Sequence, residues 1–316
     1  MSQEAVTVAL PASGQRRRVT TFDRMWRSLW AAKFPLLGLA ILSVVVIMAV
    51  GAQWIAPHDP NAVQLADRLL PPVFVQGGTA AHPLGTDALG RDVLSRLIYG
   101  ARVSLLVGLM AVLVAGAIGV TLGMLAGFFG GWLDDVIMRI ADIQLAFPFI
   151  LLAISVLAVL QARRGAESNM STLQRVIPLV LTLGVAQWVT YARMARSVTL
   201  SLREKEFVEA ARALGDSKAS IMFRNILPNA LAPLIVLASF NVASTILSEA
   251  ALSFLGLGVP PSVPTWGGML AESRELLVSG VWWLATIPGL AIMLTVLSIN
   301  LIGDWLRDFL DPRLRN

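Results

Sequence analysis

The stretch Glu209–Pro228, EAARALGDSKASIMFRNILP, is a polar, alanine-rich segment between two long apolar runs. Apolar residues recur at helical spacing, i, i+3, i+4 and i+7, at Phe207, Ala210, Ala211 and Leu214. This spacing predicts a short helix with one apolar stripe. The two adjacent alanines on the stripe leave room for a closely fitting partner.

Residues at the end of this helix predict a sharp turn and a second helix. Gly215 lies where a helix favours a residue with positive φ at its C-terminus. Asp216 or Ser217 can then cap a second short helix that reaches Arg224. Pro228 suits the first turn of the next long helix, where its missing N–H is not needed. We therefore predict two short helices exposed at one membrane face.

The composition is that of a membrane protein. Of its 316 residues, 56% are hydrophobic and 14% are charged, and the mean hydropathy is +0.72. Soluble chains carry about 25% charged residues. The net charge is +5, and such an excess is typical of cytoplasmic loops in membrane proteins. The chain has no cysteine, which excludes disulfides, thiol nucleophiles and cysteine-ligated metals.

Six apolar runs are near the roughly 20 residues needed to cross a bilayer. They cover residues 34–56, 103–129, 136–160, 176–191, 230–257 and 280–302. We predict an all-α polytopic membrane protein with six transmembrane helices and both termini on one side. Pro148 should kink the third helix. The stripe Gly119, Gly123 and Gly127 in the second should let another helix of the same chain approach closely.

The remaining segments divide into a leader, loops and a tail. Residues 1–33 form a basic leader, residues 103–302 a core of membrane helices that includes the polar segment 203–228, and residues 303–316 a tail. Residues 193–224 carry seven basic and four acidic residues. Together with the leader, this bias predicts that the segment 203–228 and both termini are cytoplasmic.

Residues 57–102 are predicted to form a periplasmic loop. The string HPLGTDALGRDVLSRLIYGARVSL, His82–Leu105, predicts a tight turn and then a short amphipathic helix from about Asp92, lying in the membrane interface. Five prolines argue against continuous helix before it.

Both histidines of the chain, His58 and His82, lie in this loop. With Asp59 and Asp87 they lack the spacing of a metal-ligand set, so we expect two solvated histidines and no metal site.

The segment Glu209–Pro228 resembles the EAA motif of importer-type ABC permeases. Glu209-Ala210-Ala211, Gly215 and Leu227-Pro228 lie at the family's distances, whereas Asn225 stands where the family usually has isoleucine. The string from His82 to Leu105 and the string SEAALSFLGLGVPPSVPTWGGML, residues 248–270, resemble the dipeptide/oligopeptide/nickel branch. The resemblance covers about residues 34–312 and implies the type I ABC importer permease fold, with a cytoplasmic coupling helix.

The same resemblance implies partners and a docking site. Importers of this branch pair two permeases in a bacterial inner membrane with two ATP-binding subunits and an extracytoplasmic substrate-binding protein. ATP and Mg²⁺ are bound by the ATPases, so this chain is expected to hold no cofactor. The residues that the resemblance assigns to ATPase docking are Phe207, Glu209, Ala210, Ala211, Leu214, Gly215, Leu227 and Pro228.

Polar residues inside the fifth apolar run are candidates for a solute path. They share one helix face and are Asn241, Ser244, Thr245 and Ser248. They predict either a water-filled path or hydrogen bonds between helices. Glu249 lies 21 residues after Pro228, about 31 Å at helical rise, and is expected near the outer membrane edge.

Catalytic motifs are absent from the sequence. It has no phosphate-binding Gly-x-x-x-x-Gly-Lys-Ser/Thr loop and no His-Glu-x-x-His. We therefore expect a transport subunit without its own ATPase site. Two alternatives stay open: a secondary transporter driven by an ion gradient, which should have ionisable residues near mid-membrane, and an intramembrane enzyme, which would use a serine such as Ser244 or Ser248.

Overall fold

The computed structural model describes residue 29, residues 33–162 and residues 171–310. The predicted leader, residues 1–33, and the last six residues of the tail fall almost wholly outside these ranges. The described part is helical and has no strand beyond one isolated bridge between Thr86 and Asp92, which confirms the predicted all-α class.

The helices follow one another in a simple order. They are α2 (Lys33–Val50), α3 (Ala52–Ile55), α4 (Val93–Phe129), α5 (Gly131–Leu145), α6 (Phe149–Ala162), α7 (Thr172–Leu202), α8 (Glu206–Ala213), α9 (Lys218–Ser220), α10 (Leu227–Phe254), α11 (Trp266–Ser273) and α12 (Trp283–Leu310). A 3₁₀ turn, η1 (Leu65–Asp67), lies in the long loop, and a π-helix, η2 (Ile221–Ile226), leads into α10.

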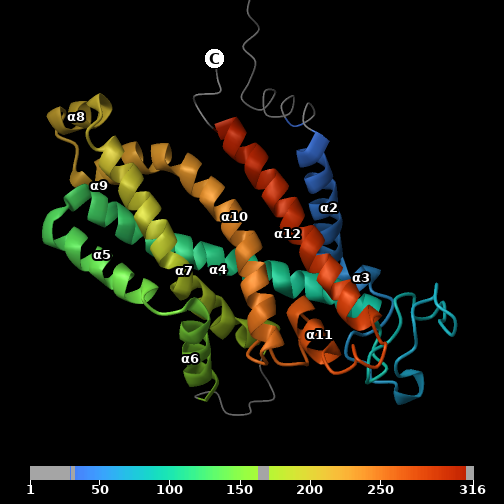
Figure 1. Ribbon diagram of the computed structural model, residues 1–316. Coiled ribbons are helices and arrows are strands. Elements are labelled where there is room, and N and C mark those ends of the chain that lie inside the picture. Colours follow the sequence, from blue (N-terminus) through green and yellow to red (C-terminus); the bar gives the residue numbers. More distant parts are fainter. Residues whose placement is uncertain (1–28, 30–32, 163–170, 311–316) are drawn as a thin grey trace, which may run out of the picture.

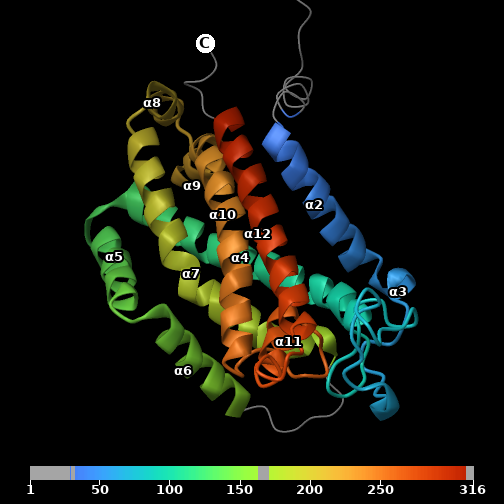
Figure 2. The same cartoon turned by 45° about the vertical axis from the view of Figure 1, so that its right-hand side comes forward.

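Five helices of the described ranges are long and apolar enough to cross a membrane. They are α2, α4, α7, the continuous α9–η2–α10 helix and α12. The bent pair α5 and α6 gives a sixth span if it is counted as one. The start of α2, the end of α12 and the short α8 lie at one end of the bundle, while α3 and α11 lie at the other (Figure 1 and Figure 2).

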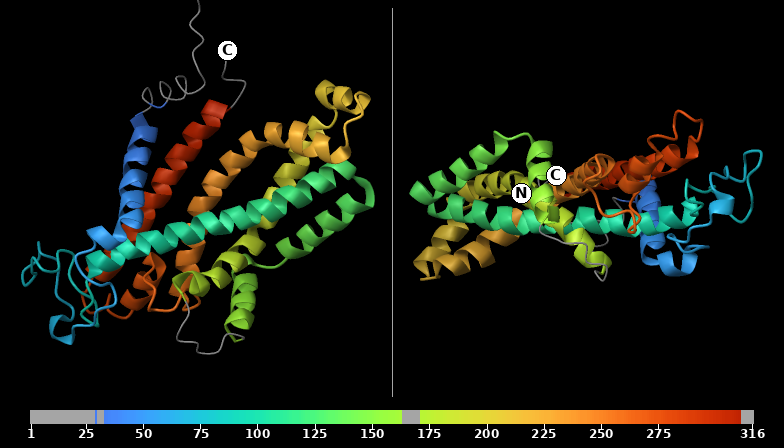
Figure 3. Two further views of the ribbon diagram at one scale, coloured as in Figure 1. Left: turned by 180° about the vertical axis from the view of Figure 1, so that it is seen from behind. Right: turned by 90° about the horizontal axis from the view of Figure 1, so that it is seen from below.

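Helix α4 runs obliquely across the other helices and packs along α7 (Figure 3). Its predicted glycine stripe makes this contact. A Cβ atom at Gly123 would overlap the carbonyl oxygen and Cα of Ala192, and one at Gly127 would lie 2.8 Å from the carbonyl oxygen of Arg196. The two backbones therefore touch, and the prediction of close packing within one chain is confirmed.

The third apolar run is not one kinked helix. Helices α5 and α6 meet at 93° around a break that ends at Pro148. A proline restricts the residue before it to extended conformations, so Phe147 cannot continue α5. The predicted position of the distortion is correct, but its size is underestimated: the helix is broken into two at 93° and is not merely kinked.

The prediction of a separate short interfacial helix from about Asp92 is wrong. Its residues form the first turns of the 37-residue α4, which Asp92 caps by accepting a hydrogen bond from the Ser95 N–H at 2.8 Å. Val93 and Ile98 are buried, and so is Arg96, with only 2% of its surface exposed. The amphipathic pattern arises because the polar face of this segment packs against protein groups that pair with it.

Those groups form an ion-pair network at the end of the bundle opposite α8. Arg96 contacts Asp87 and Glu272, each at 2.5 Å, and Arg91 contacts the same two carboxylates at 2.7 and 2.6 Å. Asp87 precedes α4, and Glu272 lies in α11. The network therefore joins the long loop, the start of α4 and the segment between α10 and α12.

A single methyl group should disturb the contact between α4 and α7. In Gly123→Ala the new Cβ has no space beside Ala192, and we expect about 1–3 kcal/mol of destabilisation. In the matched control Gly116→Ala the new Cβ lies 3.9 Å from the Tyr191 ring, an ordinary contact, so stability should be unchanged or slightly raised. Denaturant unfolding of both variants in one detergent measures the difference, and equal stabilities would contradict the packing argument.

Candidate functional site

The segment from α8 to α9 is a helix–turn–helix unit at one end of the bundle (Figure 1). Helix α8 closes at Gly215, which has a φ of +85°. The N–H of Asp216 donates to the Ala211 carbonyl at 3.0 Å, and the N–H of Gly215 donates to the backbone carbonyl of Arg212 at 3.1 Å. This pair of bonds is the Schellman closure. The Ser217 hydroxyl accepts from the Ser220 N–H and caps α9, so the predicted local fold is confirmed.

The inner face of α8 anchors it to the bundle. Val208 and Ala211 are buried, at 0% and 5% exposure, in an apolar cluster with Ile221, Ile226 and Met124. Met124 belongs to α4 and the two isoleucines to η2. The unit is therefore packed on the membrane helices and does not hang from a free loop.

The outer face of α8 is apolar and uncovered in this chain. Leu214 is 87% exposed and Phe207 38%, and Ala210 between them is exposed as well. The predicted stripe therefore splits, because Ala211 turns inward while the other three residues face out. The spacing defines a wide apolar stripe, but only tertiary packing decides that its Ala211 edge is buried beside Val208.

The other predicted docking residues surround this face in different environments. Glu209 and Gly215 are exposed, Leu227 is half-buried, and Pro228 is exposed at the start of α10. The π-helix η2 just before Leu227 was not predicted. No composition signal marks a π-turn, which adds one residue to a helical turn and is common near functional sites.

The polar stripe on α10 is mostly bonded within its own helix. The hydroxyls of Ser244 and Thr245 donate to the Asn241 carbonyl at 3.1 and 2.6 Å, and Ser248 donates to the Ser244 carbonyl at 2.9 Å. Thr245 is buried and also contacts Gln187 of α7 at 3.1 Å. Ser244 is exposed, whereas Asn241 and Ser248 are half-buried. The four residues thus divide between a helix–helix contact and an open face.

Glu249 is fully buried near the end of α10 that adjoins α11. Ser253 donates to its carboxylate at 2.7 Å, and Ser104 of α4 donates at 3.2 Å. The same Ser104 hydroxyl accepts the N–H of Trp266, the first residue of α11, at 3.4 Å. Glu249 thus ties three helices together.

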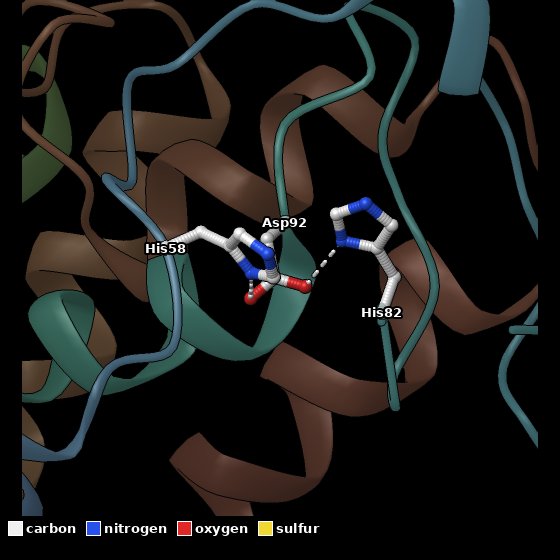
Figure 4. Close-up of side chains that lie close together, drawn as sticks. All are labelled: His58, His82 and Asp92. Carbon is white, nitrogen blue, oxygen red and sulfur yellow. Dashed lines mark hydrogen bonds and ion pairs between the residues drawn. The ribbon is translucent and has the colours of Figure 1, made fainter. Parts of the chain in front are cut away.

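The sequence predicted two separate, solvated histidines, but the structure places them side by side. Their rings lie 4.8 Å apart, and both point toward Asp92 at the start of α4 (Figure 4). His82 is 5% exposed and contacts the Asp92 carboxylate at 3.0 Å. Asp59 and Asp87, the two acids that the sequence analysis considered together with the histidines, are not part of this group. The fold alone brings in Asp92.

A cavity of about 910 Å³ adjoins His58. His58, Asn61 and Ser262 line it together with Arg102 of α4 and Thr172 at the start of α7. The cavity lies at the end of the bundle opposite α8.

Comparison with known proteins identifies the family to which the chain belongs. Residues 119–316 match the family described as binding-protein-dependent transport system inner membrane component, and residues 20–72 match the N-terminal TM domain of oligopeptide transport permease C. The chain is 44% identical to the di/tripeptide transport system permease protein DppC of Pseudomonas aeruginosa, over 92% of each chain.

Two further relatives cover nearly the same length. The dipeptide transport system permease protein DppC of Escherichia coli is 44% identical over 94% of this chain and 95% of its own. The glutathione transport system permease protein GsiD of Pectobacterium atrosepticum is 38% identical over 99% and 98%. The chain therefore belongs to the family of binding-protein-dependent transport system inner membrane components, and it is a permease subunit of an ABC importer, not an ion-gradient transporter.

Proposed function

We propose that this permease carries dipeptides, oligopeptides or a related small solute, and that partner ATPases drive it through α8. The observation that carries the docking proposal is the uncovered apolar face Phe207, Ala210 and Leu214 on a helix whose opposite face is anchored. A force applied to α8 reaches the membrane helices directly, because Val208 and Ala211 pack on α4 and η2.

The proposed docking through α8 requires separate partner subunits. Two ATP-binding subunits bind ATP and Mg²⁺, a second permease completes the path, and an extracytoplasmic binding protein delivers the solute. The substrate class is supported by the names of the relatives, which transport dipeptides, tripeptides or glutathione. This chain contributes the path and the docking helix and has no ATPase site of its own.

Leu214→Asp should prevent docking. Leu214 is the most exposed side chain of the outer face, and a carboxylate buried there without a partner is costly. We expect the affinity for the ATPase subunits to fall at least about tenfold, which corresponds to 1.4 kcal/mol. Co-purification of the ATPases from detergent-solubilised membranes measures this.

The matched control is Val278→Asp, which makes the same change at a side chain that is 95% exposed in the segment before α12. It should leave ATPase co-purification intact. If both variants retain their ATPases, α8 is not the docking helix.

We propose that α8 and both termini face the cytoplasm of a bacterial inner membrane. The basic residues of the coupling segment, 203–228, support this orientation. The chain has no cysteine, so a single introduced thiol reports one position. A membrane-impermeant maleimide should label Val278→Cys in intact spheroplasts, and it should label Ala219→Cys, an exposed position of α9 outside the docking face, only after permeabilisation. The opposite pattern would reverse the proposed topology.

The exposed part of the α10 polar stripe is the proposed contribution to the solute path. Ser244→Trp should reduce uptake severalfold by filling this face while ATPase co-purification persists. The control Ser43→Trp replaces another exposed serine whose hydroxyl also bonds its own helix, on α2 at 2.6 Å, and should transport normally. Equal uptake by the two variants would remove Ser244 from the path.

A further inference from the structure

Every imidazole of this chain lies in one cluster. The sequence has two histidines and no cysteine. His58 follows α3, His82 lies 24 residues later in the long loop, and both meet Asp92 at the start of α4 (Figure 4). Three segments that are separate in the sequence thus bring two nitrogen ligands and one carboxylate together.

The distances in this cluster are close to those of a metal site. The His82 Nδ1 atom lies 3.0 Å from one Asp92 oxygen, and the His58 Nδ1 atom lies 3.8 Å from the other. One ligand atom from each of the three residues can be chosen so that all lie within 4.8 Å of one another. Nitrogen and oxygen ligands held 2.0–2.1 Å from a tetrahedral Zn²⁺ lie about 3.3 Å apart. Moving the half-exposed His58 ring toward Asp92 would bring its 3.8 Å separation from the carboxylate closer to this value.

One ligand atom in the cluster has no hydrogen bond. The His58 Nδ1 is shielded from solvent and has no hydrogen-bond partner among the described residues, because 3.8 Å to Asp92 is too long for one. A buried polar atom of this kind requires an explanation. An ion between the imidazole and the carboxylate would satisfy it.

The carboxylate is held in place from the other side. Asp92 accepts hydrogen bonds from the N–H and the hydroxyl of Ser95, at 2.8 and 2.7 Å. The hydroxyl of Ser95 in turn accepts the backbone N–H of His58 at 3.0 Å. Such outer contacts orient metal ligands and raise metal affinity. Here they also fix the backbone of a second ligand.

We propose that His58, His82 and Asp92 form a binding site for a divalent transition-metal ion of the Zn²⁺ type. Two imidazoles and one carboxylate suit zinc or its neighbours better than Mg²⁺ or Ca²⁺, which take oxygen ligands. In the metal-free chain His82 Nδ1–H donates to Asp92. On metal binding that proton moves to Nε2, so that Nδ1 presents its lone pair, and a water fills the fourth position.

The site has an entry path and a structural consequence. His58 is 34% exposed and lines the 910 Å³ cavity, so an ion can reach it from solution. A bound ion would join the segment after α3 to the start of α4. The ion would then fix the wall of the cavity in place of the hydrogen bond between His82 Nδ1 and Asp92.

Metal titration of the full-length permease in nanodiscs tests the site. The affinity tag must contain no histidine, since the chain has only two. Zn²⁺ added to the wild type should bind at one ion per chain in isothermal titration calorimetry and raise the unfolding temperature. Co²⁺ at the same site should give the visible d–d absorption of a low-symmetry complex with imidazole ligands.

Variants distinguish this site from adventitious binding. His58→Ala removes one ligand and leaves the Asp92 cap intact, and it should weaken Zn²⁺ binding at least about tenfold and abolish the thermal shift. Asp59→Asn changes the adjacent carboxylate, which lies outside the cluster, and should bind like the wild type. Unchanged Zn²⁺ affinity in His58→Ala, or no stoichiometric binding by the wild type, would overturn the proposal and leave His82 as an internal brace for Asp92.

Discussion

The backbone contact between α4 and α7 sets the arrangement of this molecule. Three glycines four residues apart let the two helices touch at Ala192 and Arg196. In a bilayer, apolar side chains gain little by leaving lipid for protein, so close van der Waals contact supplies much of the association. This contact holds the oblique α4, whose two ends adjoin the α8 unit and the histidine cluster. Its last turns support α8 through Met124, and its first residue follows Asp92.

Buried charge organises the end of the bundle away from α8. The buried Arg91, Arg96 and Asp87 pair there with one another and with the more exposed Glu272, and the buried Glu249 accepts hydroxyl hydrogen bonds. Breaking a buried pair leaves an uncompensated charge, which is strongly destabilising. The loop before α4 and the α11 segment are therefore held to the helices, although neither contains a long helix of its own. Gly100 permits the same attachment by leaving space for the Trp266 ring.

Helix α8 combines a fixed face with a free one. The small Ala211 and the buried Val208 fix it to η2 and α4, while Leu214 and Phe207 remain without cover. The Schellman closure at Gly215 keeps the unit short, so only a few residues separate α8 from α10. At the histidine cluster, the Ser95 hydroxyl likewise makes two contacts: it donates to the Asp92 carboxylate and accepts the backbone N–H of His58.

Local patterns in the sequence correctly predicted the helical class, the apolar runs, the turn at Gly215 and the close approach of a helix to the glycine stripe, because each depends on local spacing or on one residue's conformational freedom. The sequence also indicated the family through strings of adjacent residues. Tertiary structure alone decided that Ala211 faces inward, that residues 93–102 belong to α4 and that His58 and His82 meet Asp92. Those outcomes depend on contacts with other segments of the chain, such as Glu272 beside Arg96, Met124 beside Val208 and His58 beside Asp92, and no local pattern encodes such contacts.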